Sequence, residues 1–171
     1  MRNFLMPTRG FTIIELIVII IVVGILAVSA YPLMGGRSGV DVAVYQAELV
    51  SLLRQQQQRA MQDTATDKLY SACVADKDVA LFTFNSGVEC PSPENISQIC
   101  AERDDCVRVE KQDAVTFRGP ERINFDSMGC PYTNASKPAL LCAEGTIIIE
   151  VDGETTREIM INQQGYIQAL N

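Results

Sequence analysis

The stretch "RGFTIIELIVIIIVVGILAV", residues 9–28, contains one carboxylate, Glu15, in a run that carries no other charge after Arg9. The apolar run extends from Phe11 to Tyr31, and these 21 residues would reach roughly 32 Å as a helix. That length can cross the hydrocarbon core of a bilayer, so we predict a membrane-spanning helix. A carboxylate in such a span costs roughly 2.5–3.5 kcal/mol on insertion scales and marks a functional contact where it is tolerated.

The charges and the cysteines predict the same topology for this helix. Arg2 and Arg9 precede the run with no acidic residue, which places the N-terminus in the cytoplasm. All six cysteines follow the run, and an even number of cysteines is typical of an oxidising compartment such as the periplasm. Two alternatives for the apolar run fit less well. A secretory signal peptide normally has a shorter apolar region. A simple single-pass anchor fits the length of the run but does not explain why Glu15 is present. A further alternative is that Glu15 is a stray charge that reaches the water near the interface.

The six cysteines can form three disulfides, in any of 15 connectivities. We expect sequential pairing because short loops close most readily. The expected pairs are Cys73 with Cys90, Cys100 with Cys106, and Cys130 with Cys142. Zinc binding would require closely paired cysteines as in CxxC, and no two cysteines lie that close, so no metal site is expected.

The composition argues against an enzyme and against a dedicated nucleic-acid binder. The chain has a net charge of -7 and contains no histidine, which removes the usual general base and the commonest metal ligand. No phosphate-binding loop or nucleophile motif is present, so no catalytic residue and no cofactor are expected. The acidic residues that could form small clusters are interpreted as solvated loop charges: Asp76, Asp78, Asp104, Asp105, Asp152 and Glu154.

The pattern after the apolar run predicts an α+β domain. Pro32 and the glycines that follow it predict a kink or a local unwinding of the helix. The pattern then turns amphipathic, and a stripe of residues that is apolar except for Gln56 recurs at helical spacing: Val42, Tyr45, Leu49, Leu52, Leu53, Gln56 and Ala60. We interpret glutamines 55–58 as the solvated face of this helix, except where Gln56 meets the domain. Strands are expected at 79–84, 106–111, 114–119, 122–126, 145–153, 157–162 and 165–170, in an antiparallel sheet packed on the helix.

Gly10 followed by "FTIIEL" resembles the processing site of type IV prepilins and of type II secretion pseudopilins. The resemblance implies that prepilin peptidase cuts between Gly10 and Phe11 and that Phe11 is then N-methylated. Glu15 would become the fifth residue of the mature chain and pair with the new amine of a neighbouring subunit. Because each charge is neutralised only on assembly, Glu15 would set the axial register of packed helices. Pro32 lies where many pilins carry a proline.

Three further segments, "ELVSLLRQQQQRAM", "INFDSMGCP" and "EIMINQQGYIQ", are similar to minor pseudopilin H and its fimbrial relatives, the GspH/FimT type. Two cysteine-containing insertions, residues 90–106 and 129–142, depart from the simplest pattern of that type, and we expect them to be long loops braced by disulfides. The resemblance implies a type IV pilin-like fold. Its expected parts are a leader (1–10), a membrane and assembly helix (11–34), an amphipathic helix (35–63) and a disulfide-braced β-rich domain (64–171).

The expected function is that of a minor type IV pilin which takes part in pilus assembly or initiation, with the mannose-sensitive haemagglutinin (MSHA) type as one variant. A minor pseudopilin of a type II secretion system is the alternative, and DNA capture is disfavoured by the acidic charge. The expected partners are other pilin or pseudopilin subunits, prepilin peptidase and inner-membrane lipid, with no nucleic acid. We expect a single-pass protein of the bacterial inner membrane, its C-terminal domain in the periplasm, that then enters a pilus or pseudopilus.

Overall fold

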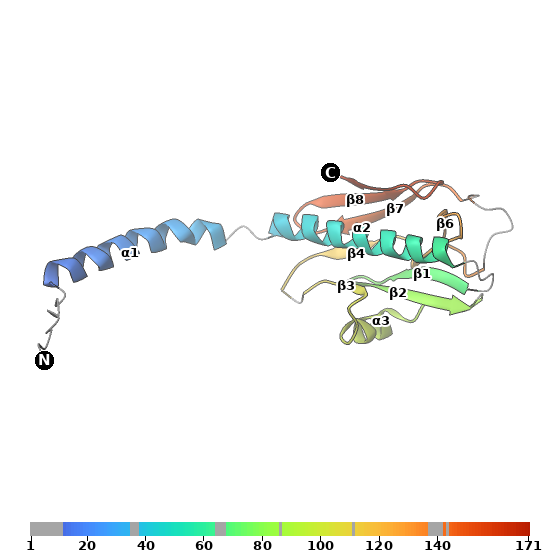
Figure 1. The fold of residues 1–171 in the computed structure, drawn as a ribbon, viewed down its shortest axis with the longest axis horizontal. Coiled ribbons are helices and arrows are strands. Elements are labelled where there is room, and N and C mark those ends of the chain that lie inside the picture. Colours follow the sequence, from blue (N-terminus) through green and yellow to red (C-terminus); the bar gives the residue numbers. More distant parts are fainter. Residues whose placement is uncertain are drawn as a thin grey trace, which may run out of the picture. The chain divides into compact units, whose positions relative to one another are not determined.

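A computed structural model describes residues 12–34, 38–63, 68–85, 87–110, 112–136, 142 and 144–171, with the backbone alone for 27–34 and 38–41. The chain divides into two units, residues 1–37 and 38–171. The first unit contains helix α1 (Ile13–Met34), and the second begins with helix α2 (Ser38–Gln62). The described parts of the predicted long helix are α1 and α2 (Figure 1).

The second unit has two antiparallel sheets. The first has strand order β3-β2-β1-β5-β6, and the second has strand order β4-β7-β8-β9. The strands of the first sheet are β1 (Lys68–Val74), β2 (Asp78–Asn85), β3 (Cys106–Arg108), β5 (Arg122–Phe125) and β6 (Pro131–Tyr132). The strands of the second sheet are β4 (Thr116–Arg118), β7 (Ile147–Asp152), β8 (Thr156–Ile161) and β9 (Ile167–Leu170).

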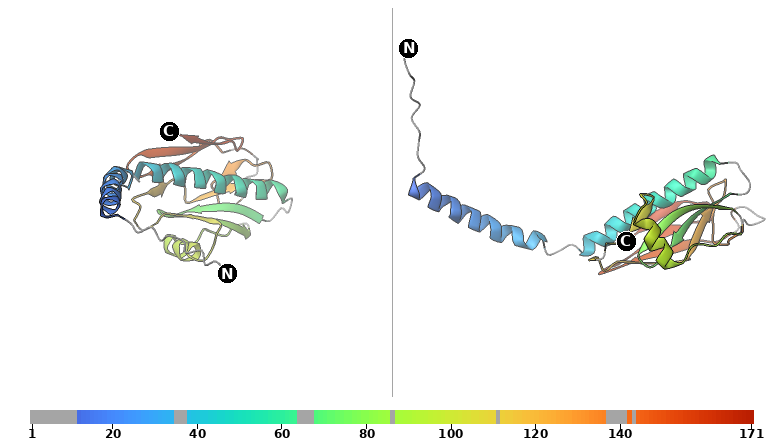
Figure 2. Two further views of the ribbon diagram at one scale, coloured as in Figure 1. Left: turned by 60° about the vertical axis from the view of Figure 1, so that its left-hand side comes forward. Right: turned by 90° about the horizontal axis from the view of Figure 1, so that it is seen from below.

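Helix α2 packs against strands of both sheets and closes the main core (Figures 1 and 2). Its side chains Leu49 and Leu53 are fully buried and belong to the same apolar cluster as Ile123 of the first sheet and Ile149 of the second. The predicted apolar stripe is confirmed, since all seven of its residues are buried. Truncating one of these leucines to alanine would cost about 2–5 kcal/mol by the usual cavity penalty. The chain therefore has the predicted α+β architecture, with two antiparallel sheets in place of the single sheet that was expected.

A short helix, α3 (Pro93–Cys100), covers the other face of the first sheet. Successive strand residues point to opposite faces, so Val74 joins the core under α2, while Cys73 packs with Ile96 and Cys100 under α3. The rings of Phe82 and Phe84 stack on this second face with their centroids 5.1 Å apart. Arg103 lies over the ring of Phe82, and Arg122 lies over the ring of Phe84.

The structure contains three disulfides, and their pairing is the sequential one that the sequence predicts. Cys73 is bonded to Cys90, Cys100 to Cys106, and Cys130 to Cys142. The first two bridges hold the segment that contains α3 to strands β1 and β3. That segment is short and carries little apolar surface of its own, so cross-links are an effective way of ordering it.

Three elements were not predicted from the sequence. Strand β1 contains Ser71, Ala72 and Cys73 in place of β-branched residues, so its sequence carries a weak strand signal although it lies at the centre of its sheet. Helix α3 lies inside an insertion that we expected to be a loop; Pro93 stands in its first turn, a position that favours a helix start. Strand β6 is two residues long. The expected strand at 106–111 is also shorter, and ends at Arg108.

Candidate assembly site

The first turn of α1 is built around Thr12. The Thr12 side-chain oxygen accepts a hydrogen bond from the backbone N–H of Glu15 at 3.3 Å, and the Thr12 carbonyl accepts one from Leu16 at 3.2 Å. Thr12 therefore satisfies N–H groups that a helix start leaves without partners. Glu15 lies in this first turn and is exposed. Its negative charge is favoured there because the positive end of the helix dipole lies at the N-terminus of the helix.

The rest of α1 presents apolar side chains in every direction. From Ile13 to Leu26 the large apolar side chains are 41–82% exposed within this chain. A helix that is apolar on all sides, with no polar face to turn toward water, is normally covered by lipid or by other helices. This segment of α1 therefore requires a cover of lipid or of other helices.

Several predictions about this segment lie outside the described residues. Gly10 and Phe11, where cleavage and methylation are expected, precede the first described residue. The backbone of α1 continues through Pro32 to Met34, and the kink predicted at Pro32 stays a prediction. Among the described helices, none combines the length and the hydropathy that a membrane span requires.

Three glutamines fasten α2 to the sheets, each through its side-chain amide nitrogen. Gln46 donates hydrogen bonds to the carbonyls of Glu158 and Leu170, both at 2.8 Å, and so joins α2 to strands β8 and β9. Gln46 is 3% exposed, which makes these bonds costly to leave unmade. Arg54 lies further along α2, and its side chain donates a hydrogen bond to the carbonyl of Ile167 at 3.0 Å, which adds a second link to β9.

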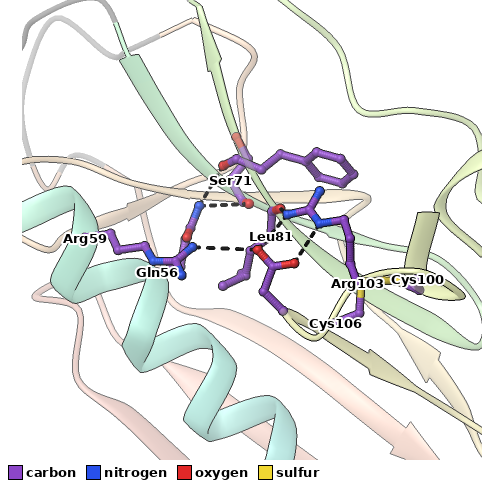
Figure 3. Close-up of polar contacts among 9 residues, drawn as sticks. Gln56, Arg59, Ser71, Leu81, Cys100, Arg103 and Cys106 are labelled. Atoms are coloured by element: carbon purple, nitrogen blue, oxygen red, sulfur yellow. Dashed lines mark hydrogen bonds and ion pairs between the residues drawn. A yellow bond between two sulfur atoms is a disulfide. The ribbon is translucent and has the colours of Figure 1, made fainter.

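Gln56 makes the equivalent links to the first sheet. It is fully buried and donates to the carbonyls of Ser71 in β1 at 3.2 Å and of Phe82 in β2 at 2.7 Å. Figure 3 shows Gln56 and Arg59 pointing from α2 toward these strands. The prediction that Gln56 meets the domain is confirmed.

Gln57 joins two turns that belong to different sheets. Its amide nitrogen donates to the carbonyls of Gly129 at 2.8 Å and Gly165 at 2.7 Å. Both glycines have φ of +83°, and a Cβ placed on Gly165 would lie 1.9 Å from the carbonyl oxygen of Gly129. The two turns therefore touch backbone to backbone, which only glycine allows at Gly165. The prediction that Gln57 belongs to a solvated face is wrong: the side chain is half-buried because it bridges these turns.

Several acidic residues that were expected to be solvated instead have structural partners. Arg103 forms a two-pronged ion pair with Asp105 at 2.7 and 2.6 Å, and Arg59 approaches the same carboxylate at 3.9 Å (Figure 3). Hydrogen bonding by Arg103 lowers the pKa of Asp105 below its ordinary value.

Two more of the clustered carboxylates correct that expectation. Asp78 is 4% exposed and accepts a hydrogen bond from Ser97 at 2.5 Å, which ties β2 to α3. Asp152 pairs with Arg118 at 3.1 Å across strands β7 and β4. Asp76, Asp104 and Glu154 are exposed, as expected. These pairings across strands and helices depend on tertiary contacts, which the sequence pattern alone does not reveal.

A family model described as the prokaryotic N-terminal methylation motif matches residues 5–31. The match covers residues just before α1 and most of that helix. A motif of this description implies processing by a prepilin peptidase and assembly with other subunits, and it implies anchoring in the inner membrane by the N-terminal helix.

A crystal structure of the type IV minor pilin FimU from Pseudomonas aeruginosa aligns with a TM-score of 0.49 at 14% identity, covering 75% of this chain and 92% of that chain. A search of curated proteins gives no match.

Proposed function

We propose that this chain is a minor type IV pilin, a low-abundance subunit that is cleaved after Gly10, methylated at Phe11 and incorporated during assembly or initiation of a pilus. The observation that carries the proposal is the methylation motif at residues 5–31, which includes most of an apolar helix with a lone carboxylate in its first turn. Within the filament, Glu15 pairs with the N-terminal amine of an adjacent subunit.

The exposed surface of α1 supports this role. Apolar side chains on every face suit a helix that is covered first by lipid and then by the helices of neighbouring subunits. In such a low-dielectric bundle an unpaired carboxylate is strongly disfavoured and a paired one is tolerated, so the pairing selects one axial offset. The domain then faces the periplasm and, after assembly, the surface of the pilus.

A pilus is favoured over a type II secretion pseudopilus by the three disulfides, which suit a subunit that meets the extracellular medium. The second candidate is a minor pseudopilin of the GspH type, favoured by the sequence similarity in α2 and in the last two strands. We assign the subunit to the GspH/FimT type, with an MSHA-type pilus as the specific variant. DNA capture is disfavoured because the net charge is -7 and several described arginines are engaged by carboxylates or carbonyls.

The proposal is tested by replacing Glu15 and measuring incorporation into sheared filaments by immunoblot. Glu15→Gln keeps the size of the side chain and removes its charge, while Glu15→Asp keeps the charge and serves as the matched control. We expect both variants to accumulate in the inner membrane at the level of the parent chain. Incorporation of Glu15→Gln should fall about tenfold or more, the effect of losing roughly 1.4 kcal/mol of docking energy. Equal incorporation of the Gln variant and the parent chain would contradict the proposal.

A further inference from the structure

The turn between β5 and β6 brings together three side chains that can bind a metal ion. The ligand atoms of Asp126, Cys130 and Cys142 all lie within 4.8 Å of one another, the one such group among the residues that the structure describes. Cys130 and Cys142 are bonded to each other here, with their Cα atoms 5.0 Å apart. The expectation of no metal site was based on the absence of CxxC spacing, and the fold joins cysteines that are 12 residues apart.

The carboxylate of Asp126 has a free oxygen in this group. Asp126 is 2% exposed, and its Oδ1 atom accepts hydrogen bonds from the backbone N–H groups of Met128 at 2.8 Å and Cys130 at 2.9 Å. Its Oδ2 atom is buried and has no hydrogen-bond partner. A buried carboxylate oxygen without a partner is costly, so a ligand that supplies positive charge at Oδ2 would be favoured.

Each of the two cysteines has a backbone contact that does not depend on the disulfide. The backbone N–H of Cys130 is bonded to Asp126, while the carbonyl of Cys142 accepts a hydrogen bond from Gln163 at 2.5 Å. After the S–S bond opens, the first contact keeps Cys130 beside the carboxylate, and the second restrains the backbone of Cys142. Cys130 is 3% exposed and Cys142 is half-buried, so an ion would enter from the side of Cys142.

We propose that the dithiol form of Cys130 and Cys142, together with Asp126 Oδ2, binds one thiophilic divalent cation of the Zn²⁺ class. Two thiolates and one carboxylate form a three-ligand set that a solvent molecule completes to a tetrahedron. Thiolate ligands select Zn²⁺ over Ca²⁺ or Mg²⁺, which prefer oxygen. The disulfide and the bound metal are alternative states of the same pair.

The exchange between these states is balanced. Binding of the cation to the dithiol releases two protons to water and forms two metal–sulfur bonds. A disulfide oxidant, R–S–S–R, then takes two electrons from the two cysteine sulfurs. The Cys130–Cys142 bond forms, the metal ion leaves, and two protons from water complete two R–SH products. The metal therefore protects the pair until oxidation releases it.

The first test is Co²⁺ binding to the full chain in detergent micelles, without oxygen and with a phosphine reductant. Thiolate–cobalt charge-transfer absorption reports the sulfur ligands, and competition with Zn²⁺ gives the affinity for zinc. We expect the reduced chain to bind Co²⁺ with this absorption and the oxidised chain to lack it. Asp126→Asn keeps an oxygen for the two backbone N–H bonds, and we expect it to weaken binding at least about tenfold.

The matched controls separate this site from the other cysteines. Replacing Cys130 and Cys142 together by serine should abolish the tight site, while replacing Cys100 and Cys106 by serine should leave it unchanged. If the reduced chain binds Co²⁺ equally well with and without Cys130 and Cys142, the proposal is overturned.

A second variant tests the site without a reductant, so that unfolding of the reduced chain cannot obscure the result. Cys142→His prevents this disulfide, keeps three ligands with Cys130 and Asp126, and leaves the other two bridges closed. It should bind Zn²⁺ at least about tenfold more tightly than Cys142→Ala. Equal zinc affinities of these two variants would overturn the proposal.

Discussion

Replacing Gln57 by alanine should loosen the junction between α2 and the two sheets. The variant removes hydrogen bonds to Gly129 at 2.8 Å and Gly165 at 2.7 Å and leaves both carbonyls without this donor. Each such bond contributes about 0.5–1.5 kcal/mol, so we expect a loss of roughly 1–3 kcal/mol in the free energy of unfolding. The domain should stay folded, because Gln46 and Gln56 still fasten α2 to the strands.

The matched control is Gln58→Ala, which makes the same chemical change one residue further along α2 at an exposed position. Its effect should lie within about 0.5 kcal/mol, because Gln and Ala differ little in helix propensity and no described contact is lost. Urea unfolding of both full-length variants in detergent, followed by circular dichroism, measures the difference as a shift in midpoint at constant slope. Equal midpoints for the two variants would refute the role given to Gln57.

Two further predictions concern the same domain. Gly165→Ala forces an alanine to φ of +83° with its Cβ 1.9 Å from the Gly129 oxygen, and should lower the free energy of unfolding by roughly 2–6 kcal/mol. The control is Gly145→Ala, because a Cβ at Gly145 meets nothing within 4 Å, and it should change the free energy of unfolding by no more than about 0.5 kcal/mol. Hydrogen bonding by Arg103 lowers the pKa of Asp105 in the folded state. The pair therefore stabilises the fold at pH values above 3.8, the ordinary pKa of the group. This stabilisation is lost as the pH falls through the lower pKa of the folded state. Asp105→Asn should therefore reduce stability at neutral pH and flatten its loss on acidification, as measured by urea midpoints from pH 7 to the acid range; a parallel loss in both chains would contradict this assignment.

The parts of the fold that follow from short-range periodicity were predictable. The apolar run predicts helix α1, and the stripe of buried residues predicts which face of α2 packs on the sheets. Runs of β-branched residues such as "TIIIEV" predict strands of the second sheet. Sequential disulfides also follow from loop length.

The parts that depend on tertiary contacts were not predictable from these patterns. Strand β1 is central because β2 and β5 pair with it on either side, not because its residues favour a strand. A sequence pattern shows only that Gln57 is polar. Its amide links the two sheets because the turns at Gly129 and Gly165 come close together in the fold. Likewise, Asp126 is brought to the Cys130–Cys142 pair by the β5–β6 turn.

The mass of the mature protein tests the central proposal most directly. The chain is purified from membranes of a strain with active prepilin peptidase, and its intact mass and N-terminal peptide are measured by mass spectrometry. We expect residues 1–10 to be absent and the chain to begin at a Phe11 that carries one methyl group. A mature chain that still begins at Met1 would contradict the assignment to this class of assembling subunits.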